Sequence, residues 1–279
     1  MINNYQQELF PYAYNILGSA EDARDAIQDV LGHYVAVDRS HIENEKGYLV
    51  KAVINQSINL KAKRRVLSTE EVWLPEPIAT EQADSSLHTR DIVSYSMLVL
   101  LEQLNPRERA VFILKEAFSY SHEDIAEVLG FTVENSRKLL SRAKARLEKS
   151  RQPAALPRQD EGFRMIEQYI GAIQSGDVAR LEKLLSADIA FYADGGPGMQ
   201  LVMRHCQGAD KVAGLLQYVY KTFQQNYTIH LAVVNHQPAI LYYDNSRLTA
   251  CQVLEIQGGV ITQVLSMLDP EKLKLVAGK

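Results

Sequence analysis

The spacing of apolar residues divides the chain into a helical half and a C-terminal part that ends in strands. Over residues 3–65 and 89–150, apolar positions recur three and four residues apart, which is the period of a helix with one buried face. From Tyr227 onward, apolar positions alternate and β-branched residues become frequent, as in TIHLAVVN and LTACQVLEI. The pattern predicts a multidomain protein in which two all-α domains precede an α+β domain, whose curved antiparallel sheet wraps an apolar space.

The helical half carries start signals for its helices. Ser19 with Asp22 forms a capping box, and Glu45 begins a later helix after a polar loop. Residues 105–108 supply an N-cap asparagine, a first-turn proline and a box glutamate in the correct order. These signals predict where the helices of both regions begin.

Residues 119–147 have the layout of a helix-turn-helix, a motif that places its second helix in the DNA major groove. Ser121 with Asp124 caps the first helix. Gly130 ends that helix in a left-handed conformation, and Thr132 caps the second helix. A basic amphipathic helix in an ordinary bundle has a similar pattern, so both interpretations stand for this segment alone. The solvent-facing residues of the second helix are Asn135, Arg137, Lys138, Arg142, Lys144 and Arg146.

Charge is distributed unevenly along the chain. The net charge of -4 and the sequence pI of about 6.0 argue against a protein that coats nucleic acid. Residues 47–65 nevertheless hold five bases and no acid, and residues 132–151 hold seven bases and two acids. Between them, residues 66–103 hold seven acids and one base. Two basic segments on either side of an acidic one favour two DNA-contacting modules whose connection avoids the phosphates, although one basic segment alone is typical of a solvated helix face.

Breaks in the pattern define four segments. Pro75 and Pro77 interrupt the helical period, and Pro153 and Pro157 mark a second break. Trp73, the only tryptophan, lies in the first break, where an aromatic side chain favours docking on a surface. The expected domains are a helical domain at 1–65, an acidic linker at 66–88, a helix-turn-helix domain at 89–152 and an α+β domain at 160–279.

The remaining composition indicates several absences. Cys206 and Cys251 are the only cysteines and give neither a disulfide framework nor metal-ligand spacing. The first ten residues lack the pattern of a secretory signal, and no apolar run reaches membrane-spanning length. We therefore predict a cytoplasmic protein with no cofactor, no metal site and no membrane partner.

In this arrangement, residues 1–150 resemble the extracytoplasmic-function (ECF) group of bacterial sigma factors. SAEDARDAIQDVLGHYV is similar to the second helix of that family, KGYLVKAVINQSINLKAKRR to its third, and LNPRERAVFILKEAFSYSHEDIAEVLG with NSRKLLSRAKARL to its final domain. WLPEP at 73–77, DGG at 194–196 and DPEKL at 269–273 resemble the subgroup that carries a SnoaL-like C-terminal extension. In that subgroup the second motif usually reads DGGGK. Here Pro197 and Gly198 follow DGG, so the chain lacks the motif's lysine, and any role of that lysine cannot be assigned to this chain.

The resemblance implies three groups of site residues. The second helix would bind core RNA polymerase through Ile27, Gln28, Asp29, Val30 and Leu31, although core packing explains Ile27, Val30 and Leu31 equally well. The loop at 38–44, the third helix and the helix-turn-helix would bind promoter DNA through Tyr48, Asn55, Lys61, Lys63, Arg64, Arg65, Asn135, Ser136, Arg137, Lys138, Arg142, Lys144 and Arg146. An interdomain regulatory site would comprise Trp73, Leu74, Pro75, Glu76, Pro77, Asp194, Gly195, Gly196, Asp269, Pro270, Glu271, Lys272 and Leu273.

The predicted function is that of an RNA polymerase sigma factor that directs promoter recognition and transcription initiation. Its SnoaL-like domain would regulate activity by docking on the linker and the DNA-binding domains, with room for a small-molecule ligand in its pocket. The alternative is a one-component transcriptional regulator with a ligand-binding C-terminal domain. An enzyme fused to a DNA-binding module would use Asp194, His205 or Asp244 as acid or base, but their spacing forms no catalytic constellation, so we predict no catalytic residues.

Overall fold

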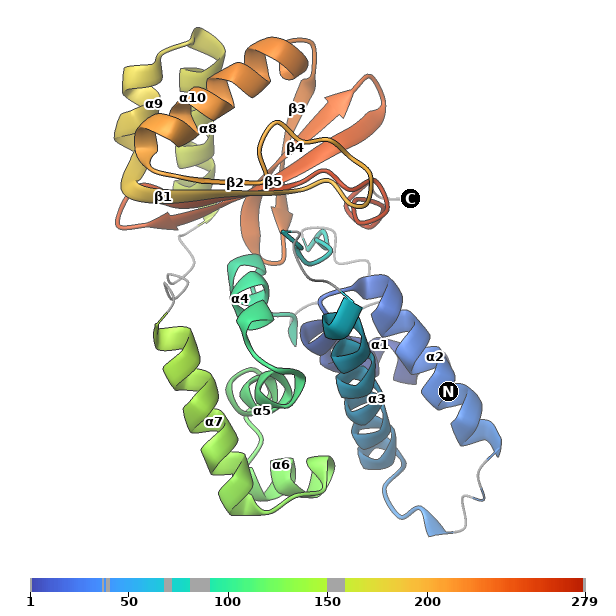
Figure 1. The fold of residues 1–279 in the computed structure, drawn as a ribbon. Coiled ribbons are helices and arrows are strands. Elements are labelled where there is room, and N and C mark those ends of the chain that lie inside the picture. The colour runs from blue at the N-terminus through green and yellow to red at the C-terminus, as the bar shows by residue number, and fades with distance from the viewer. Residues whose placement is uncertain are drawn as a thin grey trace. The chain divides into compact units, whose positions relative to one another are not determined.

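The computed structural model describes residues 2–36, 38, 41–67, 72–80, 91–149 and 159–277. The chain forms two compact units. The first comprises residues 1–70, 83–93 and 97–152, and the second comprises residues 71–82, 94–96 and 153–279. The second unit therefore includes part of the acidic linker as well as the C-terminal region. Figure 1 shows the elements of each unit.

Two groups of helices build the first unit, and their ends follow the predicted signals. Asn105 and Ser121 each accept hydrogen bonds from the first turn of their helices in a complete capping box, as predicted. Gly130 ends α6 with a φ of +69°, and Thr132 caps α7. The helices are α1 (Ile2–Leu17), α2 (Ala20–Ala36), α3 (Glu45–Leu67), α4 (Tyr95–Leu100), the 3-10 helix η3 (Leu101–Gln103), α5 (Pro106–Glu116), α6 (His122–Leu129) and α7 (Val133–Glu148). The first two residues of α4 belong to the second unit.

Apolar side chains hold each helical group together. In α1–α3, residues such as Phe10, Leu17, Leu49 and Ile54 are at most 1% exposed. The helix-turn-helix group buries Ile125, Leu139, Leu140, Ala143 and Leu147 at the spacing expected for one face of each helix. The two groups also pack on each other, because α1 and α3 contact α5, and α3 contacts α6.

The second unit is an α+β domain with a six-stranded sheet. The strand order is β2-β1-β6-β5-β4-β3, and α8, α9 and α10 lie on one side of the sheet (Figure 1). The hydrophobic core combines buried residues of these helices with buried residues of the strands. Its elements are α8 (Gln159–Ser175), α9 (Val178–Leu184), β1 (Leu185–Asp194), β2 (His205–Gln207), α10 (Ala209–Val219), the π-turn η4 (Tyr220–Gln224), β3 (Thr228–Val234), β4 (Gln237–Asp244), β5 (Arg247–Gln257) and β6 (Val260–Met267). Helical domains followed by an α+β domain confirm the predicted fold class.

The sheet differs from the prediction in one respect. It is mixed and not wholly antiparallel, because β1 pairs in parallel with β6, with Ala193 opposite Ser266 and Asp194 opposite Met267. Ile189, Phe191 and Ala193 are buried at alternating positions of β1, a strand that the apolar pattern did not predict because it directly follows a helix. Parallel strands need a long crossover connection, and the period of a strand does not say which partner it will pair with.

No helix within the described ranges is long and apolar enough to cross a membrane.

Candidate nucleic-acid interface and linker-binding site

The second helix of the helix-turn-helix, α7, exposes its basic side chains. Asn135, near the start of α7, is exposed, as are the predicted arginines and lysines. Arg137 lies 3.7 Å from Glu123 and Lys144 lies 2.8 Å from Glu116. Such exposed pairs contribute about 0–1 kcal/mol each, so a phosphate can replace the carboxylate at little cost.

Ser136 lies inside the motif and not on its DNA-facing surface. It is 0% exposed, and its hydroxyl lies 2.9 Å from His122 Nδ1 across the two helices. The structure thus places Ser136 away from the surface where the resemblance implied a DNA contact. The helical period explains this, because Leu139, Leu140 and Ala143 lie on the same buried face.

The second helix, α2, divides its implied polymerase-binding residues between core and surface. Ile27, Val30 and Leu31 are 2%, 8% and 6% exposed. Gln28 and Asp29 are exposed, and Asp29 accepts a hydrogen bond from Gln56 Nε2 on α3. Only Gln28 and Asp29 of the five residues are therefore accessible to a partner.

The implied DNA contacts on α3 lie in different environments. Tyr48 is 40% exposed, and Lys63 is exposed. Asn55 donates hydrogen bonds to the carbonyls of Lys51 and Val128, so it contacts α6 of the helix-turn-helix. The side chains of Arg64 and Arg65 lie outside the described residues.

Lys61 does not lie where a phosphate contact requires it. It is 9% exposed, and its Nζ donates to the Leu17 carbonyl and to both carboxylate oxygens of Glu102, at 2.7–2.8 Å. A charge that leaves water needs a partner, and Glu102 supplies it from the other helical group. Lys61 is thus part of an internal contact in this structure, contrary to the expectation from sequence.

Glu102 also binds Arg109, a fully buried residue of α5. Arg109 Nη1 forms an ion pair with Glu102, and Arg109 Nε donates to the Asn15 carbonyl of α1 at 2.8 Å. Burial raises the pKa of the Glu102 carboxyl, but the charges and hydrogen bonds of Arg109 and Lys61 outweigh burial and leave the pKa below its ordinary value. We call Lys61, Glu102, Arg109 and Asn15 the interhelical network, because it joins α1 and α3 to η3 and α5.

The linker binds to the C-terminal domain through the three motifs of the implied interdomain site. Asp194 is 3% exposed, and its Oδ2 accepts hydrogen bonds from Leu74 N at 2.8 Å and from Lys272 Nζ at 2.6 Å. Lys272 Nζ also donates to the Leu74 carbonyl at 2.8 Å and lies 4.4 Å from the centre of a Trp73 ring. We call Trp73, Leu74, Asp194 and Lys272 the linker clamp.

Beyond the linker clamp, the linker extends the edge of the sheet. Ala79 forms an antiparallel bridge with Val234 of the edge strand β3. Thr80 N donates to the Val233 carbonyl, and Asn235 N donates to the Ile78 carbonyl, both at 2.9 Å. An extended segment that pairs with an edge strand satisfies the unpaired backbone groups of that edge.

The DGG motif meets the DPEKL motif at close range. Gly196 has a φ of +72°, and its N donates to Asp194 Oδ1 at 2.9 Å. A Cβ at Gly196 would lie 2.5 Å from Asp269 Oδ2, whereas a Cβ at Gly198, with a φ of +82°, would meet open space. Both positions favour glycine, but only Gly196 also needs the absence of a side chain.

We therefore expect Gly196→Ala to destabilise the second unit more than Gly198→Ala. The left-handed φ costs each alanine about 1–2 kcal/mol, and the clash with Asp269 adds about 1–3 kcal/mol at position 196 only. Chemical denaturation of both variants measures the difference. Equal losses of unfolding free energy would contradict the close approach of the two motifs.

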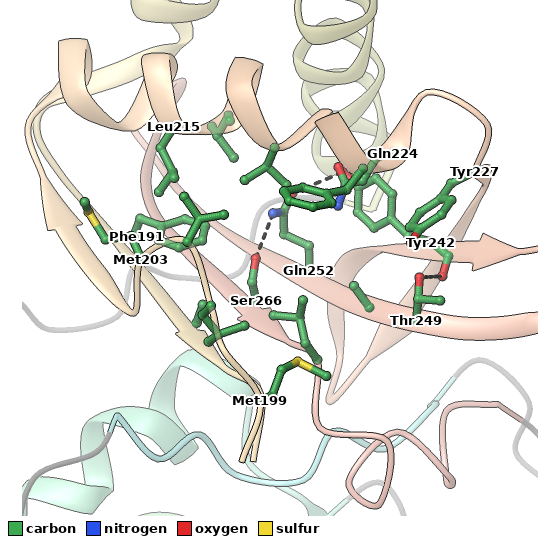
Figure 2. A pocket seen from close by; sticks show the side chains of 18 of the residues that line it. Phe191, Met199, Met203, Leu215, Gln224, Tyr227, Tyr242, Thr249, Gln252 and Ser266 are labelled. Atoms are coloured by element: carbon green, nitrogen blue, oxygen red, sulfur yellow. Dashed lines mark hydrogen bonds between the residues drawn. The ribbon is translucent and has the colours of Figure 1, made fainter. Parts of the chain in front are cut away.

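An apolar pocket opens between α10 and the sheet, as Figure 2 shows. Its volume is about 240 Å³, and none of its lining residues is charged. His205 is exposed on β2, and Asp244 is exposed at the end of β4. Of the three candidate acids and bases, Asp194 binds the linker, and neither His205 nor Asp244 lines this pocket. Within the described ranges, no cluster of His, Cys, Asp or Glu is arranged to hold a metal ion.

Comparison with known proteins identifies similar chains. The family model "Sigma-70, region 4" matches residues 95–147. The probable ECF RNA polymerase sigma factor SigI of Mycobacterium tuberculosis is 27% identical over an alignment covering 95% of this chain and 91% of that protein. For the ECF RNA polymerase sigma factor SigJ of the same species, the identity is 28%, and the alignment covers 76% of this chain and 71% of SigJ.

The fold agrees with these matches over nearly the whole length. The crystal structure of the M. tuberculosis ECF sigma factor SigJ aligns with a TM-score of 0.76 at 22% identity, covering 97% of this chain and 96% of SigJ. The helix-turn-helix carries the region 4 match, and the α+β domain lies where the resemblance implied a SnoaL-like extension. The chain is therefore similar to ECF RNA polymerase sigma factors over nearly its whole length, including the C-terminal α+β domain.

Proposed function

We propose that this sigma factor binds core RNA polymerase in the cytoplasm and directs it to promoters that its two helical groups recognise. The observation that carries the proposal is the exposed N-terminal end of α7, where Asn135, Arg137 and Lys138 follow a well-capped turn. Side chains at this end of a recognition helix reach base edges in the major groove. The exposed pair Gln28 and Asp29 on α2 supports a polymerase contact.

Run-off transcription with purified core polymerase tests this function. We expect transcripts that depend on the added chain, and only weak binding of promoter DNA by the chain alone. Tight binding to duplex DNA without polymerase, as a dimer on a palindrome, is instead the behaviour of a one-component regulator. The comparisons do not support that alternative, because the curated relatives are sigma factors.

The basic side chains of α7 are expected to divide between bases and phosphates. Arg137→Ala should relax preference at one upstream base step by about 1–3 kcal/mol, because a bidentate contact to guanine is lost. Arg142→Ala, five residues closer to the C-terminus of α7, should weaken all promoters alike and lower the salt dependence of binding. Binding titrations of the holoenzyme on matched and mismatched promoters measure both effects. Equal losses on all sequences for both variants would contradict this division.

We also propose that the C-terminal domain regulates the sigma factor by docking on the linker and the DNA-binding domains. The linker clamp and the pairing of Ala79 with Val234 support the first of these contacts. An extended chain spans about 3.3–3.6 Å per residue, so the connection from residue 68 to residue 90 would reach roughly 80 Å if it were unbound. Because residues 72–80 bind the C-terminal domain, the linker cannot extend to this full length. The distance that it allows between the two helical groups is therefore limited.

Removing residues 160–279 tests the regulatory proposal. We expect open-complex formation on promoters of different spacing to change when the linker loses its binding partner. Unchanged activity on every promoter would reject regulation by this domain while leaving the sigma function intact. The proposal includes no catalytic role, since Asp194 is committed to the linker clamp and the pocket lining carries no charged acid or base. Turnover of a small molecule by the purified chain would contradict it.

A further inference from the structure

The pocket of the C-terminal domain has a mostly apolar wall that contains a few polar side chains. Most of the wall is aliphatic, aromatic or thioether in character, including Phe191, Leu215, Val219 and Met199. Gln252 of β5 and Ser266 of β6 face this space from the sheet, as Figure 2 shows. A mostly apolar pocket with few polar groups is the usual form of a small-molecule site.

Hydrogen bonds fix the orientation of the Gln252 amide. Its Oε1 accepts from the Tyr169 hydroxyl at 2.9 Å and from the Tyr242 hydroxyl at 3.3 Å. Burial raises the pKa of both tyrosines, so both keep the hydrogen that they donate. On the other side of the amide, Nε2 donates to Ser266 Oγ at 2.8 Å (Figure 2).

This network leaves Ser266 with a hydrogen to donate. Ser266 Oγ accepts the bond from Gln252, and the described residues offer no acceptor for its own hydroxyl hydrogen. The residue is 5% exposed, so bulk water does not readily serve as that acceptor. A buried donor without a partner carries a cost that a ligand acceptor would remove.

The lining also excludes charged ligands. No lysine, arginine, histidine or carboxylate contributes to the wall of the pocket. A ligand ion that entered this wall would lose its hydration and find no counter-charge, which is costly. A neutral molecule loses little on entry and gains apolar contacts with the wall.

We propose that this pocket binds a neutral, largely apolar small molecule that carries one hydrogen-bond acceptor, such as a ketone oxygen, placed against Ser266. The size of the site supports a compact ligand, because the volume of about 240 Å³ lies just below the usual range of small-molecule pockets. The acceptor receives the Ser266 hydrogen, while the hydrocarbon part contacts the side chains of α10 and β1.

Three bicyclic probes of similar size test the ligand class on the full-length chain. We expect 1-tetralone to bind about three- to tenfold more tightly than tetralin, the range that one hydrogen bond supplies. Tetralin-1-carboxylate should bind at least tenfold more weakly than 1-tetralone, because its charge finds no partner. Saturation-transfer NMR and calorimetry measure the three affinities.

Variants then locate the site. Ser266→Ala should remove the preference for 1-tetralone over tetralin while leaving tetralin affinity within about twofold. The exposed Ser246→Ala in the β4–β5 turn is the matched control and should preserve the preference. Ala250→Leu, which adds volume to the pocket wall, should weaken both neutral probes at least tenfold. Failure of both neutral probes to bind saturably would overturn the proposal, as would an unchanged preference in a folded Ser266→Ala chain.

The pocket and the linker clamp are built from adjacent residues of the same strands. A ligand in the pocket is therefore expected to change how the linker clamp holds the linker. Ala193 and Ser266 are paired on the pocket face of the sheet, and the next residues along the strands, Asp194 and Met267, are paired on the opposite face. This step rests on the proposed regulatory function. Saturating 1-tetralone should shift the fluorescence of Trp73, which contacts Lys272. Probe binding without that shift would disprove the connection to the linker but not the ligand site.

Discussion

Replacing Asp194 with asparagine is expected to destabilise the C-terminal domain by about 3–5 kcal/mol and to release the linker. The reason is that Lys272, only 7% exposed, would lose its carboxylate partner and remain charged in a buried site. Asparagine also cannot accept on both sides, because Asp194 receives Leu74 N on one oxygen and Gly196 N on the other.

Chemical denaturation and Trp73 fluorescence measure the effect of Asp194→Asn. Trp73 is the only tryptophan, and it lies against Lys272, so its emission reports directly on the linker clamp. Glu271→Gln is a matched control in the neighbouring motif, because Glu271 pairs with Lys274 where both side chains are at least 64% exposed. That control should cost no more than about 1 kcal/mol.

A double variant distinguishes the loss of the buried ion pair from the cost of leaving one of its charges unpaired. Asp194→Asn combined with Lys272→Met removes both charges and should be more stable than Asp194→Asn alone, because no uncompensated ion remains. If the single and double variants were equally unstable, or if Asp194→Asn cost no more than the control, the ion pair would not hold the linker.

Replacing Glu102 with glutamine is expected to separate the two helical groups of the first unit. Arg109 is 0% exposed and Lys61 is 9% exposed, and both would lose their common anion. A loss of about 3–5 kcal/mol is typical when one partner of a buried ion pair is removed. Because Asn55 on α3 contacts Val128 on α6 in the joined arrangement, separation also frees part of the implied DNA-binding face of α3.

Fluorescence energy transfer measures the separation directly. Engineered cysteines at the exposed positions Gly32 on α2 and Ser141 on α7 place one dye on each helical group. The native Cys206 and Cys251 are buried, and burial raises the pKa of both thiols, so they react slowly. Transfer should fall in Glu102→Gln and stay unchanged in Glu116→Gln, whose pair with Lys144 is 41–50% exposed. Equal transfer in both variants would contradict a role for the interhelical network.

The same network predicts the effect of acid. The pKa of Glu102 is lowered in the folded chain from the ordinary value of 4.5. Its contribution to stability is therefore fully present above pH 4.5 and is lost as the pH falls through the lowered value. Energy transfer between the two dyes should fall over that acidic range in the parent chain but not in Glu102→Gln.

The amino-acid sequence alone determined the elements whose signals are local. Capping residues such as Asn105, Ser121 and Thr132 bond to backbone groups two or three positions away, so their role does not depend on the rest of the fold. The helical and alternating apolar periods predicted the order of helical and strand-forming regions for the same reason. The same local signals predicted the helix-turn-helix at residues 119–147, and family-specific motifs added the C-terminal extension; the comparisons agree with both.

Only the tertiary structure decided which distant residues meet. Lys61 was expected on a DNA-binding surface, yet it pairs with Glu102, 41 positions away, and Ser136 faces the helical core. The parallel pairing of β1 with β6 and the contact of Asp194 with Leu74, 120 positions away, also depend on how the chain returns on itself. Local periodicity determines which face of a helix or strand is buried. The partner of a buried charge depends on the tertiary fold, because a buried charge without a partner strongly destabilises the protein.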